Sequence, residues 1–381
     1  MGIRGENTIE YHPRLSDREL ERRLDRHGAF FGPKLKGEGA YFIIRSPLPA
    51  AIAPEPPARP GSLESRWFDS DYRARELVHD ISGRHYAGDA VPSAYLNFGS
   101  GNLAGLFSPS YRLDEETIWF DDSPPATDIR EIPLLPLDFD GRLFRAVSDT
   151  IRKLGEISKG RFVLGMTDIG SNLDVLFSLM PKERALKDMR KNPGGMRNAL
   201  ARVTEGYLEY YRRCRELMGG PKSPVSAFNQ MVFRGHYGKV MSESSVMISP
   251  AHFGEFVLPT VERQATLLER IVFNLDPVGH ARLLPGILGS EFIRALEWNP
   301  PDLPGDDTGM GPKDYGSAET ARFANSVLES GKKLILRFML PEQAVELAKK
   351  IPSDGVVYSI HARDPSEAER TWELLRHLTA T

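Results

Sequence analysis

The sequence predicts an α/β protein built as a (β/α)8 barrel, the TIM-barrel architecture, and its pattern of strands and helices leads to this prediction. Amphipathic helical segments separate short apolar runs of strand length, and the alternation is uninterrupted in the last third of the chain. Alternating units of this kind favour parallel strands joined by helical crossovers, and eight of them are typical of a barrel. The eight predicted strands are 40–45, 94–98, 161–167, 243–248, 271–275, 294–298, 333–338 and 356–360.

The clearest strand, helix, strand unit spans residues 243–275. Residues 243–248 are predicted to form a short buried strand, and Ser249 followed by Pro250 is typical of a helix start. Pro259 lies inside the helix that follows, where it removes a backbone donor, so we expect a kink or a restart there. Apolar residues recur at helical spacing and give the helix one buried face; they are Phe253, Phe256, Val257, Val261, Ala265 and Leu268.

The length of 381 residues and a hydrophobic content of 40% suffice for a large barrel core. We expect an N-terminal helical extension, residues 1–39, and a single barrel domain, residues 40–381, with an inserted hairpin near 225–240. Proline- and glycine-rich segments at 47–62 and 299–316 follow two of the predicted strands. Both are expected to be long loops at the mouth, the carboxyl end of the barrel, where such loops often cover a substrate.

Composition excludes several classes of function. Because 49 basic residues stand against 52 acidic ones, the formal net charge is -3 and no overall field favours nucleic acid or an anionic membrane. The single cysteine, Cys214, excludes an internal disulfide and a zinc site built from several thiolates. No apolar run reaches the roughly 20 residues of a membrane span. The expectation is therefore a cytoplasmic protein that acts on a small molecule, with a homo-oligomer left open.

Candidate catalytic residues lie at the carboxyl ends of the predicted strands, because barrel enzymes place their chemistry there. Asp276 follows the strand at 271–275, and His361 follows the strand at 356–360. Facing each other across the mouth, a carboxylate and an imidazole can act as acid and base or supply two ligands to a metal. A cap or turn aspartate and a hydrogen-bonded loop histidine are the alternatives. The other candidates are predicted to bind substrate: Asn97, Asp168, Asn172, Asn274, Glu297 and Arg337.

The segment ISPAHFGEFVLP, residues 248–259, resembles a segment of the uroporphyrinogen decarboxylase superfamily. The sequences GSNLDVLFSLM, FNLDPVG and LEWNPP are similar to other blocks of that family, and together the likeness covers roughly residues 90–375. The resemblance implies a (β/α)8 barrel, in agreement with the strand count. The superfamily includes uroporphyrinogen decarboxylase and corrinoid methyltransferases that use zinc to activate a thiol.

The matching positions differ from the family pattern. Where the decarboxylase has an aspartate and an arginine-rich segment, this chain has Asn97 and SPLPA, residues 46–50, so tetrapyrrole decarboxylation is not expected. Where the methyltransferases hold zinc, the matching residues are Asn274, Asp276 and His361, which do not form a thiolate site. Asp276 and His361 remain candidate ligands for a divalent metal such as zinc.

The leading hypothesis is a methyltransferase that moves a methyl group from a small O- or N-methylated substrate to a corrinoid carried by a partner protein. The first alternative is a lyase or decarboxylase acting on a small carboxylate, which predicts an arginine such as Arg337 or Arg363 pointing into the mouth. The second alternative is a barrel that binds a ligand without turnover.

Overall fold

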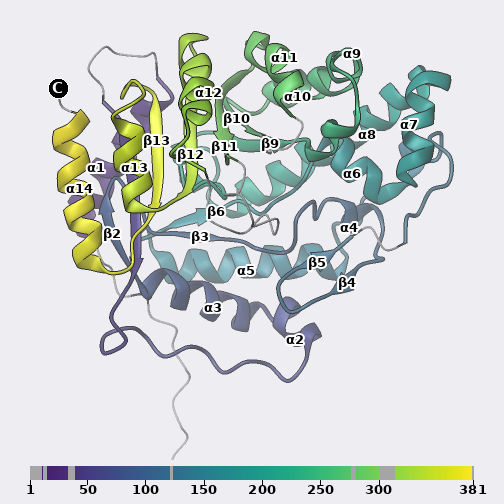
Figure 1. The fold of residues 1–381 in the computed structure, drawn as a ribbon. Helices are drawn as coiled ribbons and strands as arrows, with labels where there is room; N and C mark the ends of the chain where they lie inside the picture. Colours follow the sequence, from purple (N-terminus) through teal and green to yellow (C-terminus); the bar gives the residue numbers. More distant parts are fainter. Residues whose placement is uncertain are drawn as a thin grey trace, which may run out of the picture.

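The computed structural model describes residues 11, 15–32, 39–120, 123–275, 280–300 and 314–379. Within these ranges the strands form two main sheets, and helices surround them (Figure 1). The larger sheet has the order β2 (Arg84–Gly88), β1 (Tyr41–Pro47), β13 (Val356–His361), β12 (Lys333–Met339), β11 (Ile293–Trp298), β10 (Arg270–Leu275) and β9 (Tyr237–Met241). The smaller sheet has the order β3 (Ser93–Tyr95), β6 (Val163–Gly165), β7 (Pro224–Ser226) and β8 (Val232–Arg234). A separate hairpin consists of β4 (Arg112–Leu113) and β5 (Ile118–Trp119).

The central strands are parallel. From β1 through β13, β12, β11 and β10 to β9 every pairing in the larger sheet is parallel, and β2 is added to β1 as an antiparallel edge. The parallel strands are buried almost throughout, because helices cover them, which explains why they read as continuous apolar runs. No hydrogen-bonded strand pair joins the two sheets in the described ranges, so the fold is a mixed α/β architecture with a mostly parallel central sheet.

Seven of the eight predicted strands are confirmed, as β1, β3, β6, β10, β11, β12 and β13, and the strand predicted at 243–248 is wrong. Residues Glu243–Met247 form a short 3-10 helix, η2. Its first backbone N–H groups, those of Glu243 and Ser244, donate to the carboxylate of Asp174 at 3.0 and 2.8 Å. The first strand of the strand, helix, strand unit lies just before η2. This strand is β9, which pairs in parallel with β10.

The segment near 225–240 contains three strands. β7 and β8 pair antiparallel, with Val225 opposite Phe233. β7 also pairs in parallel with β6, and β9 pairs in parallel with β10. The first and last strands of this segment therefore belong to the two sheets of the core.

The helix containing Pro259 is interrupted, as expected. After a first turn capped by Ser249, residues Phe253–Val257 form a π-helical turn, η3, and a regular helix starts at Leu258 with Pro259 in its first turn. Proline at that position needs no backbone donor, so the restart accommodates it.

The remaining helices pack around the two sheets. In Figure 1, α3 and α5 lie below β3 and β6, and α13 and α14 lie beside β13. The described helices are α1 (Asp17–Phe30), α2 (Leu63–Phe68), α3 (Ser70–Ser82), α4 (Ala104–Phe107), η1 (Ile132–Leu134), α5 (Arg142–Ser158), α6 (Asn172–Leu179), α7 (Lys182–Lys191), α8 (Pro193–Leu217), α9 (Pro250–His252), α10 (Leu258–Ala265), η4 (His280–Leu283), α11 (Leu284–Gly289), α12 (Ala318–Glu329), α13 (Pro341–Ala348) and α14 (Pro365–Thr379).

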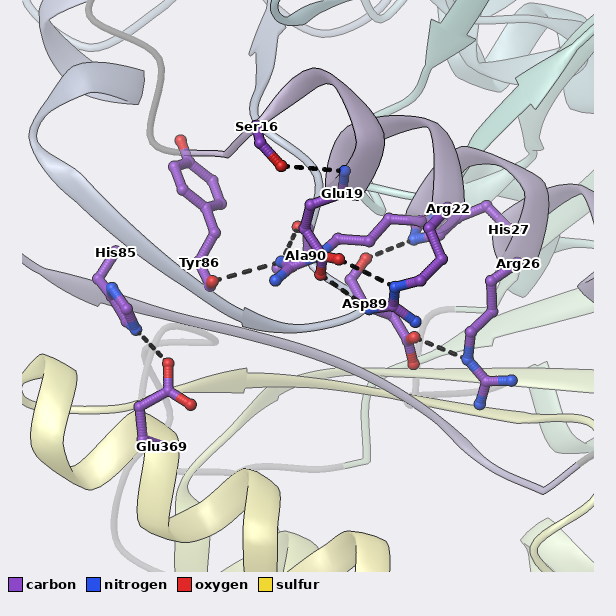
Figure 2. Close-up of polar contacts among 11 residues, drawn as sticks. Ser16, Glu19, Arg22, Arg26, His27, His85, Tyr86, Asp89, Ala90 and Glu369 are labelled. Carbon is purple, nitrogen blue, oxygen red and sulfur yellow. Dashed lines mark hydrogen bonds and ion pairs between the residues drawn. The ribbon is translucent and has the colours of Figure 1, made fainter.

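Helix α1 packs across the amino ends of the strands of the larger sheet, and Figure 2 shows the polar contacts that hold it there. Arg26 donates from Nε to Asp89 Oδ1 at 2.7 Å and from Nη2 to the carbonyl of Ala40, just before β1, at 2.7 Å. His27 contacts the carbonyl of Asp89 at 2.7 Å and accepts the N–H of Val232 at 3.0 Å. This end of the sheet is therefore closed by one helix whose buried polar groups are paired.

None of the helices in the described ranges combines the length and the apolar character that crossing a bilayer requires.

Candidate functional site

A cleft of about 460 Å³ opens at the carboxyl ends of the strands, on the edge opposite α1. Volumes of this order are typical of sites for small molecules. Side chains from β1, β3, β12, the turn after β7 and helix α3 line it, among them Arg45, Tyr95, Phe228, Arg337 and Phe338. Its charged lining includes four arginines, Arg45, Arg66, Arg73 and Arg337, and three carboxylates, Glu76, Asp80 and Glu116.

Arg45, near the end of β1, is the basic group with the fewest partners. It is half-buried, its Nε is shielded from water and makes no hydrogen bond, and its Nη2 lies 3.3 Å from His361 Nε2. Among the residues that the structure describes, no carboxylate lies within ion-pair distance of it. Burial and the neighbouring charge of Arg84 lower the pKa of Arg45 to about 10, so its guanidinium remains charged at neutral pH. A partly desolvated cation without a counter-ion favours binding an anion.

His361, at the end of β13, is neutral in this position. Since a guanidinium only donates hydrogen bonds, the Nε2 that faces Arg45 is the acceptor and the ring proton is on Nδ1. Burial and the charges of Arg45, Arg84 and Arg337 lower the pKa of His361 to about 4. At neutral pH His361 is therefore a hydrogen-bonding group without positive charge.

Arg337 and Glu297, on the neighbouring strands β12 and β11, form a fully buried ion pair. Burial acts to raise the pKa of Glu297, but the charges of Arg337 and Lys239 outweigh it and the pKa is lowered. The guanidinium carbon of Arg337 lies 3.8 Å from the ring centre of Phe228 and 4.1 Å from that of Phe338. Arg337 is thus fixed between a carboxylate and two aromatic rings.

A second polar pair lies deeper. Lys239 Nζ, on β9, is 3.9 Å from Asp168 Oδ2, and both side chains are about nine-tenths buried. They line a small, partly open cavity of about 20 Å³ together with Tyr95 and Tyr207. That volume is enough for one water molecule with polar partners. The cavity adjoins the cleft, since Tyr95 and Phe228 line both.

The predicted substrate-binding residues fall into two groups. Asn97 lines the cleft, with its Oδ1 accepting the N–H of Gly99 at 3.1 Å. Arg337 also lines the cleft, Glu297 is paired with it, and Asp168 lines the inner cavity.

Asn172 and Asn274 lie outside both lining sets. The side-chain amide of Asn172 is fully buried, donates to Ser171 and to the carbonyl of Met241, and accepts from Thr260, so it ties α6 to β9 and α10. Asn274 is buried near the end of β10, opposite Glu297 in the register. Asp276 lies outside the described residues. Arg363, which the lyase alternative considered for the mouth, is exposed and paired with Glu367.

The surroundings of His361 do not fit a metal ion. Its Nε2 is turned to Arg45, and the charges of Arg45, Arg84 and Arg337 oppose a second cation beside it. In the described part of the chain, no group of three or more histidine, cysteine, aspartate and glutamate side chains is arranged to hold a metal. We therefore assign no chemical step to a metal at this position.

Sequence reasoning missed Arg45, Lys239, Phe228 and Phe338. Arg45 is the one charged residue in the run AYFIIR, a signal that was available in the first predicted strand. Lys239 was missed because the strand of its unit was placed at 243–248 instead of 237–241. The two phenylalanines had no signal, since apolar residues near strand ends usually belong to the core.

No protein-family model matches the chain, and no curated protein matches its sequence. Among solved structures, the chain is similar to a methyltransferase from Methanosarcina mazei, with a TM-score of 0.55 and 14% sequence identity over 93% of this chain and 98% of the other. A structure of SrfJ from Salmonella typhimurium matches with a TM-score of 0.32 and 10% identity over 91% of this chain and 75% of the other. The first of these likenesses shows a shared overall fold.

Proposed function

We propose that the chain is a methyltransferase-like enzyme whose substrate is a small molecule carrying both a carboxylate and a methyl group on oxygen or nitrogen. The observation that carries the substrate class is Arg45, a charged guanidinium at the strand ends with no carboxylate partner in the described residues. The reaction class is supported by the fold likeness to a methyltransferase and by the resemblance of residues 248–259 to a superfamily that contains methyltransferases.

In this proposal the residues of the cleft bind and orient the substrate. Arg45 donates to the carboxylate from Nη1, which His361 does not occupy, and a charge-assisted hydrogen bond of this kind contributes about 1.5–3 kcal/mol. His361, neutral above pH 4 or so, accepts from Arg45 and fixes the direction of the guanidinium. Arg337 is charge-compensated by Glu297 and holds the aromatic wall of the cleft.

The methyl group leaves with cleavage of its bond to oxygen or nitrogen, and the electron pair of that bond stays on the heteroatom, which then gains a proton. The acceptor we propose is a corrinoid carried by a partner protein, as the superfamily resemblance implies. The wider architecture we propose is the (β/α)8 barrel, with the two sheets as parts of one closed ring.

A second candidate is a lyase or decarboxylase acting on a small carboxylate. Arg45 favours it, since this arginine lines the cleft at the strand ends, where that hypothesis expects such a group, whereas Arg337 lines the cleft but is already paired with Glu297. In this case the carboxylate anchored by arginine is beside the bond that breaks, or is itself released as carbon dioxide.

The experiment is turnover of O- and N-methylated carboxylic acids by the purified protein, with cob(I)alamin as methyl acceptor and the matching primary amides as uncharged controls. Methyl transfer from an acid but not from its amide supports the main proposal, and carbon dioxide release independent of cob(I)alamin supports the second. In either case Arg45→Met is expected to raise KM by about 10- to 100-fold, because it removes a charge-assisted hydrogen bond. Arg45→Lys should recover part of the loss. Failure of every acid both to react and to bind would overturn both candidates.

A further inference from the structure

Two phenylalanine rings are exposed inside the cleft, next to the anion-binding group. Phe338 is 40% exposed and Phe228 is 38% exposed, and both line the cleft with Arg45. The ring of Phe338 lies 6.0 Å from the ring of His361, which in turn contacts Arg45. The apolar wall and the cation are therefore adjacent.

The backbone holds Phe338 in an unfavourable conformation. Its φ is +58°, in the left-handed region that a bulky residue rarely adopts, and the register between β12 and β13 shifts between Leu336 and Met339. This irregularity buries Arg337 and turns Phe338 outward. Such a conformation is energetically unfavourable for a bulky residue and is found mainly where function requires it.

Phe228 is presented by a second strained turn, residues 227–231 between β7 and β8. Gln230, two residues later, has φ of +66°. The buried side chain of Asn229 fixes the turn, because its Oδ1 accepts the N–H of Met231 at 3.1 Å and the hydroxyl of Tyr237 at 2.6 Å. The ring position is therefore set before any ligand binds.

Arg337 and Tyr95 support the two rings from within. The guanidinium of Arg337 stacks on both phenylalanines, and the ring of Tyr95 lies 5.0 Å from that of Phe228. Lys239 Nζ also lies 4.9 Å from the ring centre of Phe228, so this ring is held by two cations. The rings of Phe228 and Phe338 lie 6.4 Å apart and are inclined at 64°, so their exposed parts form a fixed corner with Phe338 as its more open side. A rigid aromatic wall stacks best with a flat ring, whereas a saturated body only gains contact area.

We infer that the substrate is an aromatic carboxylate, with its carboxylate on Arg45 and its flat ring stacked on Phe338 and in edge contact with Phe228. This inference rests on the proposed function for the carboxylate and adds the aromatic body to it. A cavity of about 150 Å³ already holds benzene, so the cleft has room for a substituted benzoate.

The test compares binding of benzoate and cyclohexanecarboxylate to the purified full-length protein by isothermal titration calorimetry. The two acids match in charge and nearly in size but differ in flatness. Benzoate is expected to bind about three- to tenfold more tightly, as found for aromatic pairs. Phe338→Leu should remove most of this preference, Phe338→Tyr should retain it, and Trp119→Leu, which removes an exposed ring outside this cleft, should leave it unchanged.

The outcomes separate the two claims. Equal binding of both acids, abolished by Arg45→Met, would overturn the aromatic inference and leave the carboxylate site intact. Absence of binding by either acid and by the methylated acids would overturn the proposed function itself. If Phe338→Leu lowered binding of both acids equally, the ring would be only a general apolar contact and the inference would be wrong.

Discussion

The two ends of the parallel strands carry similar polar residues in opposite states. At the amino ends, Arg26 has a carboxylate and a carbonyl as partners, and both ring nitrogens of the buried His27 are occupied. At the carboxyl ends, Arg45 contacts only His361, and the pair has no carboxylate in the described residues. Each end thus combines an arginine with a shielded histidine. Among the described residues, the side chains of Arg26 and His27 have acidic or carbonyl partners, and those of Arg45 and His361 do not.

Whether an arginine and a histidine have all their hydrogen-bond partners distinguishes polar groups that stabilise the fold from those that are available to a ligand. A buried group whose hydrogen bonds are all made contributes to stability and has no capacity left for a ligand. A shielded cation without a counter-ion is a cost to the folded state, which a bound anion would remove. We therefore expect the α1 end to be structural, and under the proposed function the strand-end cleft is where the substrate binds.

The largest effect on stability is expected from Asp89→Ala at the α1 end. The carboxylate of Asp89 is almost fully buried and accepts from Arg26 Nε at 2.7 Å and from the N–H of Phe42 at 2.9 Å. Its loss leaves both donors without this acceptor, so the free energy of unfolding should fall by about 3 kcal/mol. Denaturant unfolding followed by circular dichroism measures this change.

Asp89→Asn is the matched control for that substitution, because it keeps an oxygen for the N–H of Phe42, while the charge is lost and an NH2 group replaces the oxygen that accepts from Arg26. Its free energy of unfolding should fall by about half as much as that of Asp89→Ala. A fall of less than about 1 kcal/mol for Asp89→Ala would contradict the view that this end is held by its polar pairs.

Much of this arrangement follows from the sequence, and the exceptions have physical reasons. The strands at 333–338 and 356–360 are confirmed almost to the residue, because runs of apolar residues indicate burial directly. The strand prediction at 243–248 is wrong because the apolar residues at its end, VMI, resemble the apolar run of a buried strand. The carboxylate of Asp174, about 70 residues earlier, caps a helical turn there instead.

The candidate site was less predictable than the fold. Arg337, Glu297 and His361 could be predicted as site candidates, because the apolar pattern shows where each strand ends. The pairing of Arg337 with Glu297, and the lack of a partner for Arg45, depend on which strands are neighbours and on the register between them. The exposure of Phe338 depends on a local register shift between β12 and β13, and no residue in the sequence predicts that shift.

A smaller effect is expected from pH. Burial lowers the pKa of His27, and that of His361 to about 4, so the unfolded chain takes up protons near pH 6.5 that the folded chain does not. The stability that depends on these neutral histidines is present above pH 6.5 and falls as the pH is lowered toward 5, by about 1–2 kcal/mol for His361. His27 changes the stability in the same direction. Unfolding midpoints measured between pH 5 and 8 check this trend.

His27→Gln should weaken the pH dependence of the free energy of unfolding and lower that free energy at pH 8. His377→Gln, at a side chain that is 76% exposed, should change neither. An unchanged slope in His27→Gln would show that His27 is not the group that titrates.

The smallest effect on stability is expected from Arg45→Met, compared with the same substitution at Arg26. Arg45 has no carboxylate partner in the described residues, so its replacement should change the free energy of unfolding by less than about 1 kcal/mol, with a gain in stability as the favoured sign. Arg26→Met leaves Asp89 without its cation and should destabilise by about 1–2 kcal/mol. Because the charge of Arg45 helps to lower the pKa of His361, Arg45→Met should also raise that pKa above about 4 in an NMR titration, whereas Arg26→Met should not. If Arg45→Met destabilised the fold as much as Arg26→Met and left the pKa of His361 unchanged, Arg45 would be a structural residue and the contrast between the two ends would be lost.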